Sequence, residues 1–546
     1  MTKPANPPDW PQYVEDFRRA GHETVDWIAN YLTTVRDLPV LATTKPGELF
    51  DALPASAPDQ GESFQAILRD FDQLIMPAVA QWNHPRFFAY FACTGSTPAV
   101  LGDMLAAALN SVGLHWKTSP AVAELEQRAL DWLREWFGLE GGDSSDFHHD
   151  YSATGENSAA ALSGGDSHSA GAGKSSSSSN RSSGSPNKWF GIIYDTASVS
   201  SMHAIVCARE MIAPEARTEG SRGDLILYAS DQAHSSIEKG AIAVGFGQNN
   251  VRKVPSDAQF RMDPAALAAM IEQDKAAGKR PCCVVATVGT TSSTSIDPVP
   301  EIAAIAERHG LWLHVDAAYA GAAAILPEHR HIFAGVERAH SLVVNVHKWL
   351  LTPTDLSAFY TRRPDVLRRA FSLTPEYLRT QDDPRAHNLM DYGVPLGHRF
   401  RALKLWFVLR YFGRERIQAI LRRHIQWARD FASLIEQDPD QRFEVVAPVP
   451  FSVVCFRFRG KYAAGRRHTD GSIQPARLSA AQRSDKETDE QNRAIMDRVN
   501  HSGRVFISGT VLNQQQVIRL AIGNLGTTWE DVLEAWELIK RAADEV

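Results

Sequence analysis

Residues 342–355, LVVNVHKWLLTPTD, place a lysine just after an apolar run. The run Leu342–Val344 is typical of a buried strand, and Lys348 follows it between His347 and Trp349. Desolvating an amine at the end of a buried strand is costly. Lys348 therefore needs a partner, an exit to solvent or a chemical use, and the rest of the chain decides among these.

From residue 189 the chain alternates short β-rich runs with helical stretches. The predicted strands are FGIIYD (190–195), DLILYAS (224–230), CCVVATV (282–288), LWLHVD (311–316) and SLVVNV (341–346). Between two of them, Asp263 and Pro264 form an N-cap and first-turn pair, and Gly278 ends that helix. Such alternation predicts an α/β fold, with a mostly parallel sheet covered by helices and ligands bound beyond the carboxyl ends of the strands.

The regions on either side of this alternation predict smaller units. Residues 12–35 have the spacing of an amphipathic helix, as do residues 124–137. After the long helix RFRALKLWFVLRYFG, residues 415–546 mix strands with a final helix from Trp529, which indicates an α+β domain. We therefore expect an N-terminal helical segment over 1–96, a large α/β domain over 97–404 and a small α+β domain over 405–546.

Two polar stretches interrupt these regions, at 139–186 and at 460–490. The first contains GDSHSAGAGKSSSSSNRSSGSP, which is too poor in apolar side chains to offset the entropy of ordering and predicts a flexible insertion. Its GAGKS imitates the end of a P-loop, but His168 stands where that motif needs a glycine. In such a tract His148, His149 and His168 lack a fixed geometry, so we expect no metal site.

Composition and charge exclude several classes of function. The 546 residues are 44% hydrophobic and 22% charged, with a net charge of -7 and scattered basic residues, which disfavours nucleic-acid binding. The five cysteines lack metal-site spacing, and the apolar run around Cys282 and Cys283 indicates core packing in a reducing, cytoplasmic setting. No run approaches the ~20 apolar residues of a membrane span, and no signal peptide is recognisable, so we expect a soluble protein.

Three of the predicted strand ends carry polar residues that suit one cofactor. Asp316 ends LWLHVD, Lys348 follows SLVVNV, and residues 196–198 lead from FGIIYD into a helix. Free N–H groups at a helix start bind phosphate, provided that the neighbouring Asp195 points away from it. An amine can form a Schiff base with an aldehyde, and a carboxylate can keep a pyridine nitrogen protonated. Taken singly, each residue is better explained as structural, but together they meet the requirements of pyridoxal phosphate.

The same segments resemble a known family. The chain is similar to the group II pyridoxal-phosphate decarboxylases, closest to the aromatic-L-amino-acid decarboxylases, in FRRAGHETVDWIANYL, HPRFFAYF, SDQAHSSIEK, VVATVGTT, LWLHVDAAYAG, NVHKWLL, PLGHRFRALKLWFVLR and VIRLAIGN. The resemblance runs from about residue 12 to the C-terminus apart from the two insertions. It implies fold type I of the pyridoxal-phosphate enzymes and a homodimer whose N-terminal helices clasp the partner.

Carried over residue by residue, the resemblance implies the contacts of pyridoxal 5'-phosphate. Lys348 would hold the cofactor as a Schiff base, and Asp316 would pair with its ring nitrogen. His234 would stack over one face of the ring, and Ala318 would lie against the other. Further contacts are implied for Ala197, Ser198, Thr291, Asn345 and His347, and for Leu396 and Gly397 at the phosphate end of the neighbouring subunit's site.

The resemblance also implies a reaction, the decarboxylation of an aromatic L-amino acid to its amine and CO2. Lys348, His234, Asp316 and Tyr377 would be the catalytic residues. Tyr377, in LTPEYLRT, matches the family's mobile-loop tyrosine, whose implied role is to return a proton to Cα. His234 would also contact the substrate, and its side-chain pocket would be lined by Trp82, Tyr90, Phe91, Ala92, Cys93, Val112, Leu114 and His115. Departures from the family in this set leave the preferred amino acid open.

Two alternatives stay open. Aldehyde synthases of the same family lose CO2 and then oxidatively deaminate, and they usually carry phenylalanine in place of the loop tyrosine. Tyr377 and His234 therefore favour simple decarboxylation. A catalytically silent paralogue that binds the cofactor would result if the insertion 139–186 misplaced the phosphate-binding segment that follows it.

Overall fold

A computed structural model describes residues 9–91, 93, 95–139, 188–373, 386–460 and 485–546. Contacts divide the chain into two compact units. The first unit contains residues 1–94, 426–446 and 452–546, and the second contains residues 95–425 and 447–451. Each unit has a sheet of its own.

The second unit is built on a seven-stranded sheet in the order β1-β7-β6-β5-β4-β2-β3. Its strands are β1 Phe190–Tyr194, β2 Leu225–Ser230, β3 Val251–Val254, β4 Arg280–Thr287, β5 Trp312–Asp316, β6 Ser341–Val344 and β7 Ser357–Thr361. Neighbours from β6 through β5, β4 and β2 to β3 run parallel, whereas β7 runs antiparallel to both β6 and β1. β1 therefore points in the same direction as the parallel strands, and the predicted fold class is confirmed.

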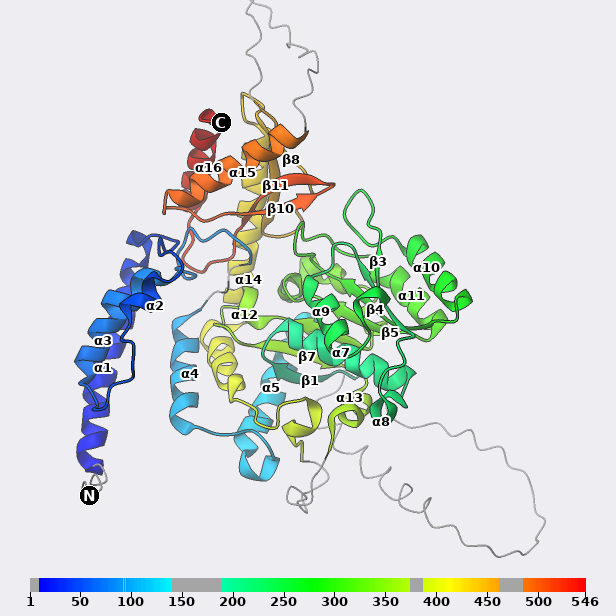
Figure 1. The fold of residues 1–546 in the computed structure, drawn as a ribbon, viewed down its shortest axis with the longest axis horizontal. Coiled ribbons are helices and arrows are strands. Elements are labelled where there is room, and N and C mark those ends of the chain that lie inside the picture. The colour runs from blue at the N-terminus through cyan, green and yellow to red at the C-terminus, as the bar shows by residue number, and fades with distance from the viewer. Residues whose placement is uncertain (1–8, 92, 94, 140–187, 374–385, 461–484) are drawn as a thin grey trace, which may run out of the picture. The chain divides into compact units, whose positions relative to one another are not determined.

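Helices surround this sheet, as Figure 1 shows. They are α4 Thr97–Leu109, α5 Pro120–Phe137, α7 Ala197–Ile212, α8 Ala216–Glu219, α9 Ser235–Ala243, α10 Pro264–Ala276, α11 Val299–His309, α12 Val346–Trp349 and α13 Pro364–Phe371. α7 packs against β1 and against β4 to β7, and α10 and α11 pack against β4. Because helices cover the sheet, every residue of β2, β5, β6 and β7 is buried.

The ends of α10 confirm a prediction made from local sequence. The Asp263 side chain accepts hydrogen bonds from the N–H groups of Ala265 (2.8 Å) and Ala266 (3.2 Å). Pro264 occupies the first turn, where its missing N–H costs nothing. Gly278, two residues beyond the end of the helix, has a φ of +74°, a conformation that glycine adopts without strain.

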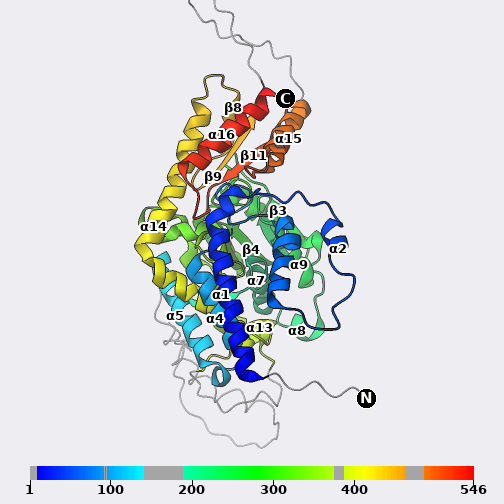
Figure 2. The same ribbon diagram turned by 90° about the vertical axis from the view of Figure 1, so that its left-hand side faces the viewer.

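The first unit contains a four-stranded antiparallel sheet in the order β10-β11-β9-β8. Its elements are α1 Trp10–Thr34, α2 Glu48–Ala52, α3 Phe64–Asp70, β8 Phe443–Val445, β9 Val453–Phe458, α15 Asp485–His501, β10 Ser508–Leu512, β11 Gln515–Ala521 and α16 Trp529–Asp544. α15 packs against β9, β11 and α16, and Figure 2 shows α15 and α16 beside these strands. The helix predicted over 12–35 is α1, and none of its residues is buried.

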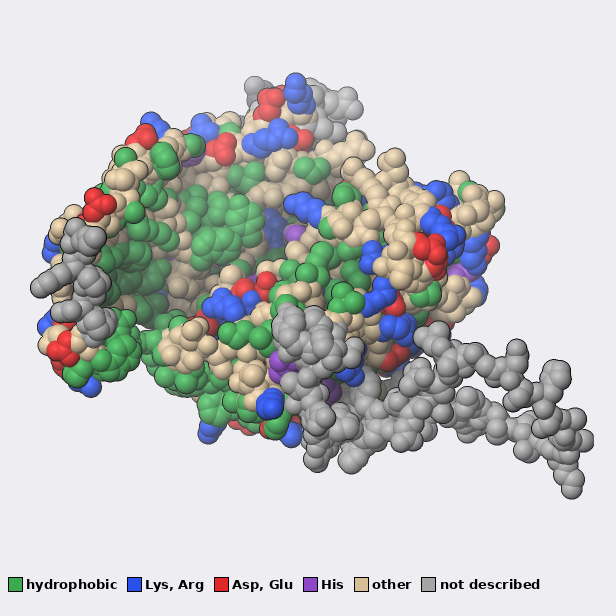
Figure 3. Space-filling model, turned by 60° about the horizontal axis from the view of Figure 1, so that its bottom comes forward, with side chains coloured by type: hydrophobic (Ala, Val, Ile, Leu, Met, Phe, Trp, Pro, Cys, Tyr) green, Lys and Arg blue, Asp and Glu red, His purple; other side chains and the backbone are tan. Residues whose placement is uncertain are grey.

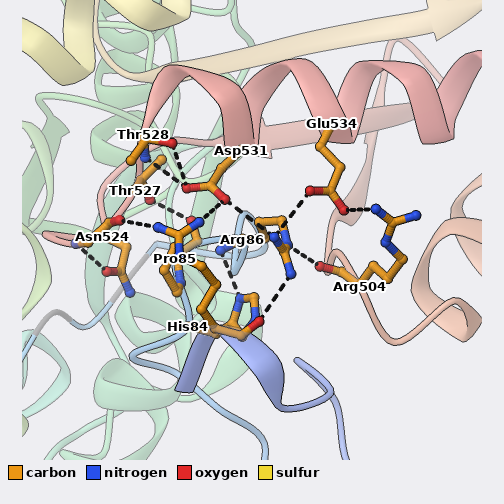
Figure 4. Close-up of polar contacts among 11 residues, drawn as sticks. His84, Pro85, Arg86, Arg504, Asn524, Thr527, Thr528, Asp531 and Glu534 are labelled. Carbon is orange, nitrogen blue, oxygen red and sulfur yellow. Dashed lines mark hydrogen bonds and ion pairs between the residues drawn. The ribbon is translucent and has the colours of Figure 1, made fainter. Parts of the chain in front are cut away.

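Ion pairs join the segment 84–86 of the first unit to α16 (Figure 4). The side chain of Asp531 is 2% exposed and pairs with Arg36 and Arg86. Arg86 also contacts Glu534, with 3.1 Å between Nη1 and Oε2. Since a carboxylate at a helix start also favours the helix dipole, this network stabilises α16 while it fixes the N-terminal segment. The N-terminal and C-terminal segments, predicted as separate regions, thus form one unit.

The longest helix is α14, Arg401–Glu436, which is interrupted at Gly413 by a φ of +66° and a ψ of 169°. The boundary predicted between residues 404 and 405 falls inside it. The sequence does not reveal where a helix passes from one unit to the next, because its apolar spacing is the same whichever neighbours it packs against. Nearly all of the insertion 139–186, and most of 460–490, lie outside the described residues.

Cys282 and Cys283 are fully buried in β4, so the prediction that they pack in a core is confirmed. Among the helices that the structure describes, none combines the length and the apolar character that crossing a bilayer requires.

Several histidines are buried in their neutral form, among them His203 and His314. His203 of α7 lies between Tyr194 and Phe371, with ring centroids 4.3 and 4.6 Å from its own. Burial lowers the pKa of His203 to about 4. Burial also lowers the pKa of His314 to about 4, although the nearby Asp316 carboxylate opposes the shift. At neutral pH both imidazoles are therefore uncharged in the folded protein.

We expect the free energy of unfolding to fall as the pH drops from about 6.5 toward about 4. In this window the unfolded chain binds protons on His203 and His314 that the folded chain excludes. Urea unfolding at a series of pH values measures this dependence. His203→Phe should flatten it, because phenylalanine fills the space without titrating, whereas the exposed His501→Phe should not. The assignment is wrong if His203→Phe and the wild type show the same pH dependence.

Candidate active site

The carboxyl ends of five strands lie along one edge of the second unit's sheet, because β1, β2, β4, β5 and β6 point the same way. Asp316 is the last residue of β5, Lys348 follows β6, and His234 follows β2. Thr291 follows β4, and Ala197 follows β1. Parallel strands thus bring together predicted site residues that are far apart in the sequence.

Lys348 and Asp316 leave neighbouring strands. Asp316 is in parallel register with Val343 of β6. Beyond the strands, the Asn345 N–H donates to the Ala318 carbonyl at 2.9 Å, and α12 then begins and carries Lys348. The Asp316 side chain is buried, and its Oδ1 accepts a hydrogen bond from the Ala318 N–H at 3.0 Å. The carboxylate is therefore fixed in direction, as a partner for a ring nitrogen must be.

His234 is electrostatically linked to both residues. It is the N-cap of α9, and its Nδ1 accepts a hydrogen bond from the Ser236 N–H at 3.1 Å. Burial and then the Lys348 ammonium lower the pKa of His234, and the Asp316 carboxylate opposes them. The imidazole is therefore neutral at neutral pH, and its ring is held by the helix that it caps.

The loop after β4 comes close to the segment after β5. The N–H groups of Gly289 and Thr290 both donate to the Ser295 carbonyl at 3.0 Å, which closes the loop. Gly289 has a φ of +87°, and a Cβ there would lie 2.4 Å from the Ala320 Cβ. Only glycine permits this approach. The loop leaves Thr291 exposed, at the edge where the other predicted residues lie.

The start of α7 has the features of a phosphate site. Thr196 is its N-cap in an extended conformation, and the Thr196 side chain forms no capping hydrogen bond. Ala197 packs with Ala318 and Val343 in one buried cluster, which places the helix start beside the ends of β5 and β6. Ser198 is exposed. N–H groups at such a helix start can bind an anion.

Asn345 and His347 flank the start of α12. Asn345 is 3% exposed, and its Oδ1 has no hydrogen-bond partner among the described residues. His347 is also buried, and its Nδ1 lies 3.0 Å from the Leu356 nitrogen. Burial and the Lys348 ammonium lower the pKa of His347 to about 4. A buried amide oxygen without a partner fits a bound group that donates a hydrogen bond, whereas only the NH2 of the Asn345 amide could donate to a phosphate oxygen.

Asp195 precedes this phosphate site and pairs with Arg401, the first residue of α14. That Asp195 points away from the phosphate stays a prediction, but the ion pair with Arg401 compensates the charge of its carboxylate. This partner could not be predicted from local sequence, since the two residues are 206 positions apart.

The segments 112–114 and 396–398 lie side by side. The Gly113 N–H donates to the His398 carbonyl at 2.8 Å, and a Cβ at Gly397 would lie 3.6 Å from the Val112 Cγ1. His398 is anchored to the buried Glu126, with 2.6 Å between Nε2 and Oε2. Leu396 is exposed. Residues predicted for the pocket and for the neighbouring subunit's site thus share one surface.

The predicted pocket residues belong to different units. Trp82, Tyr90, Phe91 and Cys93 lie in the first unit, and Val112, Leu114, His115 and His234 lie in the second. Trp82 and Tyr90 stack with ring centroids 6.0 Å apart. That these residues line a single pocket stays a prediction. Ala92 and Tyr377 lie outside the described residues.

A supporting residue that sequence reasoning missed is His314. Its Nδ1 lies 2.9 Å from the Ser341 Oγ, and its Nε2 lies 3.1 Å from the Ser201 Oγ. These contacts tie β5 to β6 and to α7 two residues before Asp316. The one signal was a polar residue inside the apolar run LWLHVD.

A mostly parallel sheet that brings a lysine, an aspartate and a helix start to one edge defines the pyridoxal-phosphate enzymes of fold type I. The family comparison is more specific. The profile of the "Pyridoxal-dependent decarboxylase conserved domain" matches residues 46–165 and 179–459. The chain belongs to this family, and it is an amino-acid decarboxylase whose cofactor is pyridoxal 5'-phosphate.

Individual relatives match over nearly the whole chain. Tryptophan decarboxylase 1 of Oryza sativa is 36% identical over 98% of this chain and 95% of its own length. Phenylacetaldehyde synthase of Arabidopsis thaliana is also 36% identical, over 98% of this chain and 97% of its own. The crystal structure of the Oryza sativa enzyme TDC with PLP and tryptamine has a TM-score of 0.83 at 34% identity, covering 100% of this chain and 99% of that one.

We expect Gly289→Ala to destabilise the protein more than Gly278→Ala. Both glycines have a positive φ, but a Cβ meets another atom within 4 Å only at Gly289. Each variant should lose about 1 kcal/mol from the backbone conformation, and Gly289→Ala about 1–3 kcal/mol more from the overlap with Ala320. Thermal unfolding of the two variants side by side measures the difference, and equal losses would contradict the close approach.

Proposed function

We propose that the protein decarboxylates an aromatic L-amino acid to the corresponding amine and CO2. The observation that carries this proposal is the placement of Asp316 and Lys348 at the ends of adjacent parallel strands, with His234 after β2 at the same edge of the sheet. The names of the relatives support an aromatic substrate, because one acts on tryptophan and another yields phenylacetaldehyde.

Each residue then has a role toward the cofactor. Pyridoxal phosphate, when bound, supplies an electron sink for the electron pair that remains when CO2 leaves. Lys348 would hold its aldehyde carbon, and Asp316 would keep a proton on its ring nitrogen. His234 and Ala318 would hold the ring between them. The phosphate and the rest of the cofactor would be contacted by Ala197, Ser198, Thr291, Asn345 and His347.

The geometry suits these roles. The Asp316 carboxylate is buried and directed by the Ala318 N–H, so it can hold a proton on a neighbouring nitrogen without competition from water. His234 is neutral and can lie over an aromatic ring without adding charge. The general acid that returns a proton to Cα would be Tyr377, in keeping with the resemblance of LTPEYLRT to the family's loop.

An aldehyde synthase is the second candidate, because a relative with that activity in its name is as similar as the decarboxylases are. Such an enzyme consumes O2 and releases H2O2 and ammonia with the aldehyde. Tyr377 and His234 favour the amine as product. A silent cofactor-binding paralogue is the third candidate, and it would release no CO2 from any amino acid.

A substrate panel tests the proposal. The purified protein with pyridoxal phosphate is incubated with L-tryptophan, L-tyrosine, L-phenylalanine, L-dihydroxyphenylalanine and L-glutamate, and CO2, amine and H2O2 are measured together. We expect CO2 and amine in equal amounts from at least one aromatic substrate, with none from Lys348→Ala. Tyr377→Phe should divert product toward aldehyde and H2O2. Peroxide from the wild type in step with CO2 would instead support the synthase, and absence of CO2 from every aromatic substrate would refute both.

We further propose that the protein is a homodimer. Helix α1 has no buried residue, and Trp10, Tyr13 and Phe17 on it are more than half exposed. On α4, an apolar row is also exposed, consisting of Leu101, Met104, Leu105 and Leu109. Hydrophobic side chains gather over a wide area of the face in Figure 3. Exposed apolar area of this extent is typical of a surface that a partner covers.

Sedimentation velocity measures this association. We expect a dimer for the wild type and a shift toward monomer for Leu101→Glu/Leu105→Glu, because two carboxylates would be buried in the interface. Ile242→Glu, at a similarly exposed apolar residue on α9, is the matched control and should remain dimeric. A wild type that sediments as a monomer while fully active would exclude the proposal.

A further inference from the structure

Two carboxylates flank the proposed phosphate site from separate segments. Asp195 directly precedes Thr196 and the start of α7. Asp355 directly precedes Leu356, whose backbone contacts the His347 ring and accepts a hydrogen bond from the His347 N–H. β1 and β7 are paired with Tyr194 opposite Ser357, so the two segments are also neighbours in the sheet.

A single arginine bridges these carboxylates. The Arg401 Nη2 contacts the Asp195 Oδ1 and lies 3.0 Å from the Asp355 Oδ2. The Arg401 side chain is only 10% exposed, whereas Arg399, 3.6 Å from the other oxygen of Asp355, is 69% exposed. Solvent screens the Arg399 contact, so Arg401 carries most of the compensation.

The charges explain why a bridge is needed. The cofactor phosphate brings up to about two negative charges to the start of α7. Burial would raise the pKa of Asp355, but the Arg401 guanidinium outweighs it and the net shift is downward, so Asp355 is ionised at neutral pH. Without Arg401, the charge of the Asp355 carboxylate would be left uncompensated near a bound dianion. Lys404 also acts on Asp355, but its amine is paired with Asp103 at 3.1 Å.

We propose that Arg401 is a positioning residue for the cofactor phosphate. It neutralises Asp195 and Asp355, and it holds the start of α7 in place against the loop that supports His347. This proposal rests on the phosphate placement under Proposed function. Arg401 need not touch the phosphate, because it acts on the two carboxylates that would otherwise repel it.

Cofactor binding to the full-length apo-protein tests this role. We expect Arg401→Met to raise the dissociation constant of pyridoxal phosphate by at least about tenfold. The dissociation constant of pyridoxal, which lacks the phosphate, should change by less than about twofold, because no dianion is then repelled. Arg422→Met is the matched control, since Arg422 lies on the same helix in an exposed pair with Glu328 and should leave both constants unchanged.

A rescue variant separates charge from packing. Asp195→Asn in the Arg401→Met background removes one repelling charge and should restore part of the affinity for pyridoxal phosphate. Equal losses of affinity for pyridoxal phosphate and pyridoxal, or no loss for either, would overturn the role of Arg401. If the wild type itself binds the two aldehydes equally well, the phosphate placement fails instead. The two failures are thus distinguishable without measuring turnover.

Discussion

The site depends on the parallel register of β4, β5 and β6. This register aligns Thr287 with Asp316 and Asp316 with Val343. The Val288 N–H donates to the Asp316 carbonyl at 2.9 Å, so the alignment continues past the end of β4. A slip of one residue would turn Asp316 to the opposite face of the sheet. The segments that carry Lys348 and Thr291 begin at these aligned strand ends. The register of the strands therefore sets where both residues lie.

Several buried polar groups around this edge have hydrogen-bond partners that support the strand ends. Asp297 accepts hydrogen bonds from the N–H groups of Met262 and Thr287, both at 2.7 Å, and so supports the end of β4. His314 is held between two serine hydroxyls beneath Asp316. A buried polar group without a partner costs about 1–3 kcal/mol, so these contacts also favour one arrangement of the strands over its competitors. The hydrogen bonds below the site thus hold the strand ends, and with them the catalytic side chains, in one arrangement.

Most elements that surround the site could be predicted from the sequence. The runs FGIIYD, DLILYAS, CCVVATV, LWLHVD and SLVVNV became β1, β2, β4, β5 and β6. The strand β7 was not predicted, because its residues, SAFYT, do not form an apolar run like those that indicated the other strands. Pairing with β6 on one side and β1 on the other defines it. The union of the N-terminal and C-terminal segments was also missed, since it depends on ion pairs such as that of Arg36 with Asp531, 495 positions apart.

The sequence by itself determined which chemical groups stand at the strand ends, because apolar runs and the polar residues that end them are local patterns. It therefore indicated Lys348, Asp316 and the start of α7 as candidates, and the family motifs indicated His234. Only the tertiary structure decided how the charges are compensated, as in the bridge from Arg401 to Asp195 and Asp355. The reason is physical: the energy of an ion pair depends on separation in space and on burial, and neither quantity is encoded by spacing along the chain.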